Sequence, residues 1–305
     1  MMSNEEMLQR AQAMRERGFP PMEQPPEQRP VTETVLHLPS ANGRSVTVYE
    51  IRPQRGLPEH CPFFINYHGG GFVKGRADRD GVYCAWLADL FDALVWDVDY
   101  ALAPEEPFPA AVEDAWAVAQ QAFEQAAELG ADPERILLLG QSAGGNLVAD
   151  VCLLARERGI VKPAAVLMEY FPADMAADPM DKLSEAQRAD EKEARRAEMG
   201  RMYNLFYTRE HDPREVLISP IFASQEQLAD FPDALVLSAG KDKLCEEDEQ
   251  FAARLAAAGV TVTARRFPKS QHGFTINRGG EWREALALHA AFFDAHLRPG
   301  KETTL

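Results

Sequence analysis

The chain has 305 residues, of which 46% are hydrophobic and 26% are charged. This composition is typical of a globular protein with a sizeable core, and it excludes wholesale disorder. The 48 acidic residues outnumber the 32 lysines and arginines, and the formal net charge of −16 disfavours binding to nucleic acid or to an anionic membrane surface.

No apolar run approaches the roughly 18 residues that a membrane span needs, so we expect none. The first residues carry mixed charges and offer no apolar signal core, which predicts a cytoplasmic protein. Four cysteines lie far apart without a C-x-x-C pair, which argues against a disulfide framework and against a metal site. We expect each to be a small buried apolar residue; they are Cys61, Cys84, Cys152 and Cys245.

In chain order, a short helix ends near Gly18 and a proline-rich stretch follows it. We interpret residues 1–30 as an N-terminal arm and residues 31–305 as the main domain. Segments 32–38 and 45–53 alternate apolar with polar residues, and the turn signal Asn42-Gly43 lies between them. They predict an antiparallel β-hairpin.

Short apolar runs separated by amphipathic stretches follow the hairpin. The pattern predicts an α/β fold with a mostly parallel sheet flanked by helices. The predicted strands are 63–67, 93–100, 135–140, 164–171, 233–240 and 261–267. The clearest predicted helices are 111–129, 146–158, 247–259 and 284–297, and we expect a turn at 132–134.

The segment 174–210 does not fit this alternation, because it is first highly charged and then rich in Met, Tyr and Phe. One reading is a solvated surface helix followed by a core helix. The other is a small helical cap over a site at the carboxyl ends of the strands, where insertions emerge. In that case Met199, Met202, Tyr203, Phe206 and Tyr207 would face a pocket. We take the predicted substrate pocket to be Phe72, Met202, Tyr203 and Phe206.

The strongest chemical motif is the G-x-S-x-G pattern of residues 140–144, which directly follows a predicted strand and precedes a helix. A serine in such a tight turn exposes its Oγ at a helix N-terminus, where negative charge is stabilised. Ser142 is therefore the candidate nucleophile. The alternative is a glycine-flanked serine that merely caps the helix.

Serine needs a base to take its proton. Of seven histidines, His272 is the best candidate, because it lies in a loop after the last strand and precedes a glycine. Asp242, at the end of the preceding strand, is the candidate that orients the imidazole. Glu246, Glu247 and Asp248 are rivals, but they fall in the following helix, where acidic residues are common.

A third motif, His68-Gly69-Gly70-Gly71, follows the strand 63–67. Its glycines expose backbone N–H groups that could stabilise an oxyanion. A flexible loop or a phosphate cradle are the alternatives, although no G-K-[ST] accompanies the glycines. We interpret His68 as a hydrogen-bonding residue that holds the loop.

Together these motifs resemble the hormone-sensitive-lipase-like carboxylesterases, from about residue 60 to the C-terminus. The resemblance also rests on 99–105, 108–110 and Asp114. It implies an α/β-hydrolase fold and hydrolysis of short-chain esters without a cofactor. It also implies a Ser142-His272-Asp242 triad, with an oxyanion hole from the N–H groups of Gly69, Gly70 and Ala143.

The sequence departs from that family at three positions. Gln141 stands where the family usually has Asp, Ala101 where it has Arg, and Lys243 where it has Pro. No triad residue is lost, but the first two changes are expected to loosen support around the serine turn. The arm of about 30 residues is also shorter than the family's usual N-terminal cap.

We therefore expect a serine carboxylesterase acting on a small-molecule ester. A deacetylase of acetylated carbohydrates is a narrower alternative, since the acidic surface disfavours anionic substrates. A ligand-binding homologue without activity, and a peptidase or acyltransferase using the same triad, are the others. A homodimer through residues 261–267 would cover a sheet edge.

Overall fold

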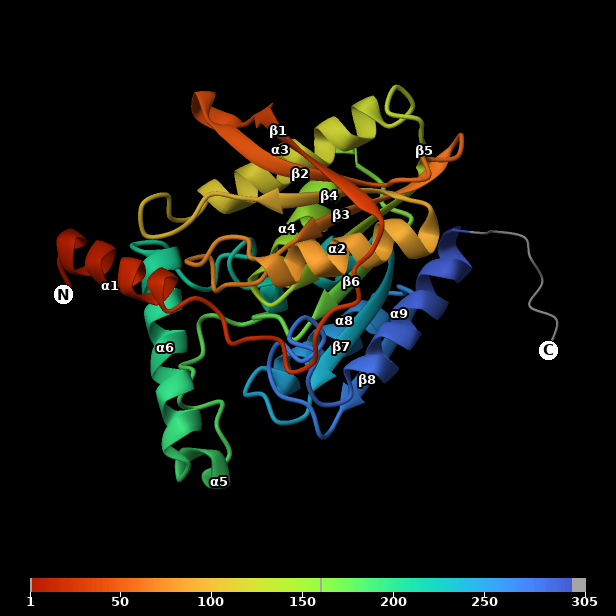
Figure 1. Cartoon of the computed structure of the whole chain (residues 1–305). Helices are drawn as coiled ribbons and strands as arrows, with labels where there is room; N and C mark the ends of the chain where they lie inside the picture. Colours follow the sequence, from red (N-terminus) through yellow and green to blue (C-terminus); the bar gives the residue numbers. More distant parts are fainter. Residues whose placement is uncertain (1, 160, 298–305) are drawn as a thin grey trace.

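An eight-stranded, mostly parallel sheet forms the centre of the computed structural model, which describes residues 2–159 and 161–297 (Figure 1). The spatial order is β1-β2-β4-β3-β5-β6-β7-β8. β1 pairs antiparallel with β2 and β2 with β4, whereas the remaining pairs are parallel. The strands are β1 (Val31–Pro39), β2 (Ser45–Pro53), β3 (Cys61–Tyr67), β4 (Leu94–Asp99), β5 (Ala131–Gln141), β6 (Ala165–Glu169), β7 (Asp233–Ala239) and β8 (Val262–Phe267). The predicted hairpin and mostly parallel sheet are confirmed.

Helices cover both faces of this sheet. Residues of α3, α4 and α8 share one buried cluster with the sheet, and residues of α2 and α9 share the other. The longer helices are α1 (Asn4–Glu16), α2 (Asp78–Phe91), α3 (Ala110–Gln125), α4 (Ala143–Arg158), α6 (Glu191–Thr208), α8 (Cys245–Ala257) and α9 (Trp282–Leu297). The short ones are η1 (Ala41–Gly43), α5 (Glu185–Arg188), η2 (Pro220–Phe222) and α7 (Gln225–Leu228). Among the described residues, no helix is long and apolar enough to cross a membrane.

The central strands are apolar because both of their faces are covered. All seven residues of β3 are buried, as expected for a parallel strand between two helical layers. The four cysteines are likewise buried and unpaired, as predicted from their spacing. The interior is therefore a conventional hydrophobic core on each side of the sheet.

One difference from the sequence prediction lies at the start of β5. The predicted turn at 132–134 falls inside that strand, at an irregularity where the register jumps from Cys61↔Ala131 to Phe63↔Ile136. The Asp132 side chain accepts the Glu134 N–H at 3.0 Å. The turn chemistry is thus present, but it forms a bulge within the strand rather than ending it.

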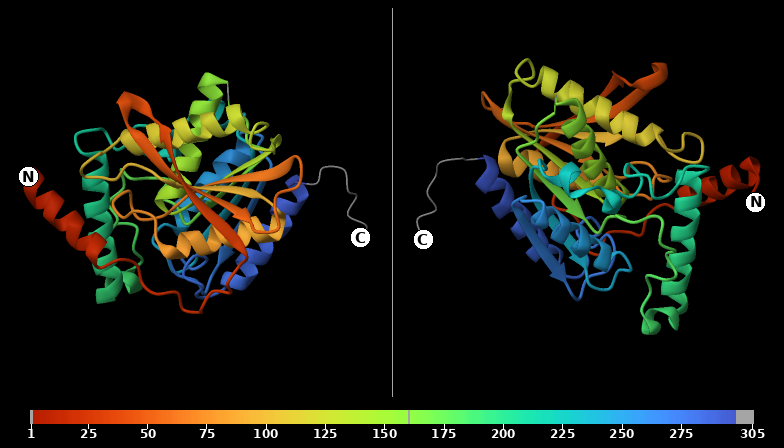
Figure 2. Two further views of the ribbon diagram at one scale, coloured as in Figure 1. Left: turned by 45° about the horizontal axis from the view of Figure 1, so that its top comes forward. Right: turned by 180° about the vertical axis from the view of Figure 1, so that it is seen from behind.

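The N-terminal arm and the segment 174–210 lie together at one side of the sheet. In both views of Figure 2, α1 packs beside α6. The Arg209 guanidinium, directly after α6, donates to Met7 Sδ and to Asn4 Oδ1 at 2.7 and 2.6 Å. The division of the chain into arm, cap and main domain stays a prediction, but these two segments contact each other.

Candidate active site

Ser142 occupies a sharp turn between β5 and α4. Its φ of 53° and ψ of −122° are strained values for a residue other than glycine. A Cβ at Gly140 would lie 2.1 Å from the Gly144 carbonyl oxygen, and a Cβ at Gly144 would lie 1.7 Å from that of Tyr67. Both positions therefore require glycine, and the turn is held further by the Ser142 N–H donating to the Glu169 carbonyl at 2.9 Å.

The structure brings Ser142, His272 and Asp242 together from three separate parts of the chain. Ser142 Oγ lies 2.9 Å from His272 Nε2, and His272 Nδ1 contacts Asp242 Oδ2. Asp242 lies just beyond β7, and His272 lies in the loop after β8. Gly273, with a φ of +75°, gives that loop a left-handed turn that suits glycine.

Asp242 is 8% exposed and held in its charged form. Burial alone would raise the pKa of its carboxyl, but the adjacent His272 ring and then Lys243 outweigh burial and lower the pKa. The Leu244 N–H also points to Asp242 Oδ1 at 3.4 Å. An ionised carboxylate at this position can fix the tautomer of the imidazole and stabilise its cation.

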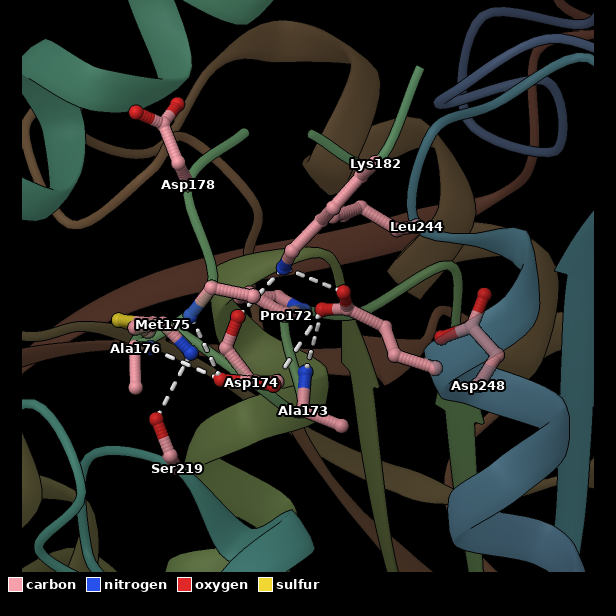
Figure 3. A network of polar contacts seen from close by, with 12 residues as sticks. Pro172, Ala173, Asp174, Met175, Ala176, Asp178, Lys182, Ser219, Leu244 and Asp248 are labelled. Carbon is pink, nitrogen blue, oxygen red and sulfur yellow. Dashed lines mark hydrogen bonds and ion pairs between the residues drawn. The ribbon is translucent and has the colours of Figure 1, made fainter. Parts of the chain in front are cut away.

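Two of the rival acids, Glu247 and Asp248, have other partners. The Glu247 carboxylate accepts the N–H groups of Ala173 and Asp174 at 3.0 and 3.3 Å and pairs with Lys182 Nζ. In Figure 3 the Lys182 side chain extends toward the loop at Ala173 and Asp174. Asp248 accepts the Phe171 N–H at 2.9 Å. Glu247 therefore holds the first part of the 174–210 segment against α8, and Asp248 holds the chain just after β6.

The glycine loop 68–71 lies directly against the serine turn. A Cβ at Gly69 would lie 3.0 Å from the Gln141 carbonyl oxygen and 3.3 Å from Ser142 Cβ. Gly70 has a φ of +146°, and Gly71 packs so closely under Tyr203 that a Cβ there would lie 2.6 Å from the ring. Ala143 is the first residue of α4, where backbone N–H groups lack a partner within the helix.

His68 is fully buried and stacks on Tyr100 at a ring-centre distance of 4.3 Å. Its Nδ1 lies 2.9 Å from the Gly69 carbonyl oxygen, and its Nε2 lies 3.4 Å from Asp99 Oδ1. Burial opposes the charged form, but Asp99 and the nearby Asp80 outweigh burial and raise the pKa of His68. These contacts suit a residue that holds the loop.

A cavity of about 340 Å³ opens above Ser142 and His272. Of the predicted pocket residues, Phe72 and Tyr203 line it, and Met199 of α6 does as well. Met202 and Phe206 are not among its lining residues. Phe206 is fully buried in the core, and Met202 packs at the boundary with α1, where its sulfur lies 4.0 Å from Arg10 Nη1.

Phe72 has a second role in this wall. Its ring stacks on that of Tyr207 with a centre distance of 3.7 Å and an angle of 8°. Tyr207 is itself fully buried and belongs to the core. The C-terminal end of α6 is therefore anchored by aromatic stacking directly beside the cavity.

Sequence reasoning missed Tyr170, which follows β6 and lines the cavity. Its ring packs edge-on against His272 at 5.1 Å, and its hydroxyl hydrogen-bonds Thr275 Oγ1 at 2.5 Å. The sequence predicts a strand over 164–171, so Tyr170 was placed inside it, whereas β6 ends at Glu169. Its nearness to the carboxyl end of that strand, at the same sheet edge as Ser142, is the signal that could have identified it.

The departures at Gln141 and Ala101 differ in their structural effect. The Gln141 side chain is buried, and neither its Oε1 nor its Nε2 has a hydrogen-bond partner. At Ala101 the backbone N–H donates to Asp114 Oδ2 at 2.9 Å, while Arg44 pairs with Oδ1 of the same carboxylate at 3.0 Å. The loop at Ala101 is therefore supported by a side chain from the β1–β2 connection, whereas Gln141 is not supported.

Within residues 2–159 and 161–297, no group of three His, Cys, Asp or Glu residues is placed to hold a metal ion. The chemistry that this arrangement can perform is nucleophilic: a serine oxygen beside a base, the base oriented by a carboxylate, and backbone donors next to the serine.

Comparison with known proteins points to the same chemistry. A model described as "alpha/beta hydrolase fold" matches residues 64–276. The esterase LipI and the carboxylic ester hydrolase LipN, both of Mycobacterium tuberculosis, are 34% and 35% identical to 70% and 80% of the chain. These matches span 66% and 64% of the two relatives, slightly under two thirds of their length. A crystallised Pyrobaculum calidifontis esterase is 31% identical with a TM-score of 0.77, over 95% of this chain and 92% of its own.

Proposed function

Because the chain belongs to the α/β-hydrolase-fold family, we propose that it is a serine carboxylesterase that hydrolyses short-chain esters of small molecules. The predicted resemblance to hormone-sensitive-lipase-like esterases is confirmed at the level of the family. The single observation that carries the proposal is the 2.9 Å contact between Ser142 Oγ and His272 Nε2. That contact gives Ser142 the base that its nucleophilicity requires.

In this mechanism His272 Nε2 accepts the Ser142 proton as Oγ attacks the ester carbonyl. The imidazolium then protonates the leaving alcohol, and an acyl-enzyme remains on Ser142. A water molecule that gives its proton to His272 then attacks the acyl group. The bond from the acyl carbon to Ser142 Oγ breaks, Oγ takes the proton back from the imidazolium, and the acid is released. Asp242 contacts Nδ1 of the imidazole throughout, which keeps Nε2 free to exchange the proton.

The negative oxygen formed in each attack needs donors. We assign that role to the backbone N–H groups of Gly69, Gly70 and Ala143, which follow β3 or begin α4 beside Ser142. The loss of one such donor typically costs about 3 to 4 kcal/mol of transition-state stabilisation. Support for the assignment comes from the close approach of Gly69 to the serine turn.

The experiment compares hydrolysis of p-nitrophenyl acetate and butyrate by the wild type, Ser142→Ala and Ser45→Ala. Ser45 is exposed and begins β2, far along the chain from the site, so its substitution controls for the loss of a serine. We expect activity in the wild type and Ser45→Ala, and at least a thousandfold loss in Ser142→Ala. Equal activity in all three proteins would refute Ser142 as nucleophile.

A fluorophosphonate probe separates the alternatives that remain. Labelling mapped to Ser142 would exclude a binding protein without activity, whereas a folded protein that is not labelled would favour one. Ester, thioester and amide versions of one acyl group would then distinguish an esterase from a peptidase or an acyltransferase. Turnover of acetylated sugars in preference to simple acetates would favour the deacetylase.

A further inference from the structure

Two cationic side chains form part of the wall of the cavity above Ser142. Lys74 follows the glycine loop, and Arg79 lies in the first turn of α2; both line the cavity. Phe19 of the N-terminal arm lies between them, with Lys74 Nζ 4.8 Å and Arg79 Cζ 3.5 Å from its ring centre. The arm therefore brings an aromatic face to two positive charges inside the candidate active site.

The hydrogen-bond partners of these two cations are neutral. Lys74 Nζ donates to the Gly18 carbonyl oxygen, and Arg79 Nη1 donates to Asn277 Oδ1 at 2.7 Å. The carboxylate beside Arg79 is that of Asp80, whose Oδ1 lies 3.9 Å from Arg79 Nε. Arg79 Nε is buried and has no hydrogen-bond partner. Arg79 Nε thus has a carboxylate nearby but no hydrogen-bond acceptor.

Burial shifts the pKa values of Lys74, Arg79 and Asp80. Burial, and then the neighbouring charges of Arg79 and Arg17, lower the pKa of Lys74. Burial lowers the pKa of Arg79 despite Asp80. Burial also raises the pKa of Asp80 to about 6, so its carboxylate is lost as an offset to Arg79 as the pH falls through that value. An anion entering the cavity would relieve the repulsion between these positive groups.

The remaining charges of the cavity do not cancel the two cations. Three further lysines also line it, namely Lys182, which pairs with Glu247, and Lys241 and Lys243. Among the acids, Glu193 pairs with Arg196 at 2.6 Å and Asp242 contacts His272. A third acid in the lining, Asp174, accepts two backbone N–H groups of its own loop. The cavity is therefore locally positive in a chain of net charge −16.

Hydrogen bonds link Arg79 to the loop that carries the candidate base. Asn277, which accepts from Arg79, donates its own N–H to the Gly273 carbonyl at 2.9 Å. Gly273 directly follows His272, the group that would protonate the leaving alcohol. The guanidinium is thus connected through the Asn277 side chain to the loop that carries His272.

We propose that Lys74 and Arg79 form a subsite for a carboxylate carried by the alcohol part of the ester. The inference rests on the proposed function and narrows it, since it replaces a neutral ester by an anionic one. It also reverses the expectation that the net negative charge of the chain disfavours anionic substrates, because the local field at the cavity is of the opposite sign.

The test compares 3-acetoxybenzoate with its neutral counterpart 3-acetoxybenzamide, with the ratio of their kcat/KM values as the readout. We expect the wild type to prefer the anionic ester by about tenfold or more, a factor that corresponds to about 1.4 kcal/mol. Lys74→Met and Arg79→Met should each lower the ratio about tenfold. Arg79→Lys should keep most of it, and Lys162→Met, an exposed lysine before β6, should leave it unchanged.

Added salt should also reduce the ratio in the wild type. A wild-type ratio near one, or an equal fall in Lys162→Met, would overturn the subsite. Calorimetry on Ser142→Ala gives a readout without turnover, in which the anionic ester should bind about tenfold more tightly than the amide. If neither ester is hydrolysed but this binding preference holds, the proposed function fails and the subsite stands.

Discussion

Replacement of Lys182 by methionine removes the cation from a buried ion pair and leaves Glu247 charged in the interior. The two side chains are 11% and 7% exposed. Loss of one partner of such a pair typically costs about 3 to 5 kcal/mol, because the remaining charge is neither solvated nor neutralised. Two backbone N–H groups still reach Glu247. We therefore expect a free energy of unfolding about 3 kcal/mol below that of the wild type at pH 8.5.

The pH dependence of this loss follows from the same carboxyl. Burial raises the pKa of Glu247 to about 7, although Lys182 lowers it. A carboxyl with a raised pKa in the folded state binds more protons there than in the unfolded chain, so stability falls as pH rises from its ordinary value through the folded value. Without Lys182 the pKa of Glu247 in the folded state rises further. At pH values above that pKa, each additional pKa unit lowers the free energy of unfolding by about 1.4 kcal/mol.

Urea denaturation at pH 6 and pH 8.5, followed by tryptophan fluorescence, measures both effects. The cost of Lys182→Met should be smaller at pH 6, and Glu247→Gln in the same chain should recover much of the loss at pH 8.5. Lys162→Met, which removes an exposed lysine, should change the free energy of unfolding by less than about 0.5 kcal/mol. A cost in Lys182→Met below about 1 kcal/mol at both pH values would refute the reasoning.

Three further predictions concern the site itself. Asp242→Asn should lower kcat on p-nitrophenyl butyrate by about 10⁴-fold with little change in the fold by circular dichroism, because the imidazole of His272 would take the wrong tautomer; a loss below tenfold would contradict this. Gly144→Ala should destabilise the protein by more than about 3 kcal/mol in urea, since its Cβ would lie 1.7 Å from the Tyr67 carbonyl oxygen; a wild-type midpoint would contradict it. Tyr203→Ala should raise kcat/KM for bulky esters relative to acetate, because its ring covers the glycine loop; an unchanged ratio would show that the ring does not limit access.

The fold and the three candidate catalytic side chains were predictable because their signals are local. A continuous apolar run such as 135–140 identifies a buried strand, and the glycines around Ser142 are required by contacts within a few residues and one neighbouring strand. Chain order then placed Asp242 and His272 after consecutive strands. The carboxyl ends of parallel strands meet at one edge, so these residues could be brought together without knowledge of long-range packing.

The lining of the cavity was less predictable, because it depends on how helices rotate against the sheet. Met199 and Tyr203 are four residues apart on one stripe of α6, and Met202 and Phe206 form an adjacent stripe. The spacing separates the two stripes but does not say which faces the cavity. Met202 packs against α1, and this contact turns the stripe of Met199 and Tyr203 toward the cavity. The contact joins positions 192 residues apart in the chain.

The path of the N-terminal arm implies an order of assembly. After Phe19 the chain continues to the far side of the cavity, where the Glu23 N–H donates to the Asn277 carbonyl and Arg278 donates to Pro25, 253 positions away. At a synthesis rate of about 5 to 20 residues per second, these partners emerge roughly 10 to 50 seconds after the arm. Phe19 can therefore meet Lys74 and Arg79 early in synthesis, but the contacts of Glu23 and Pro25 form only after residues 277 and 278 have been made.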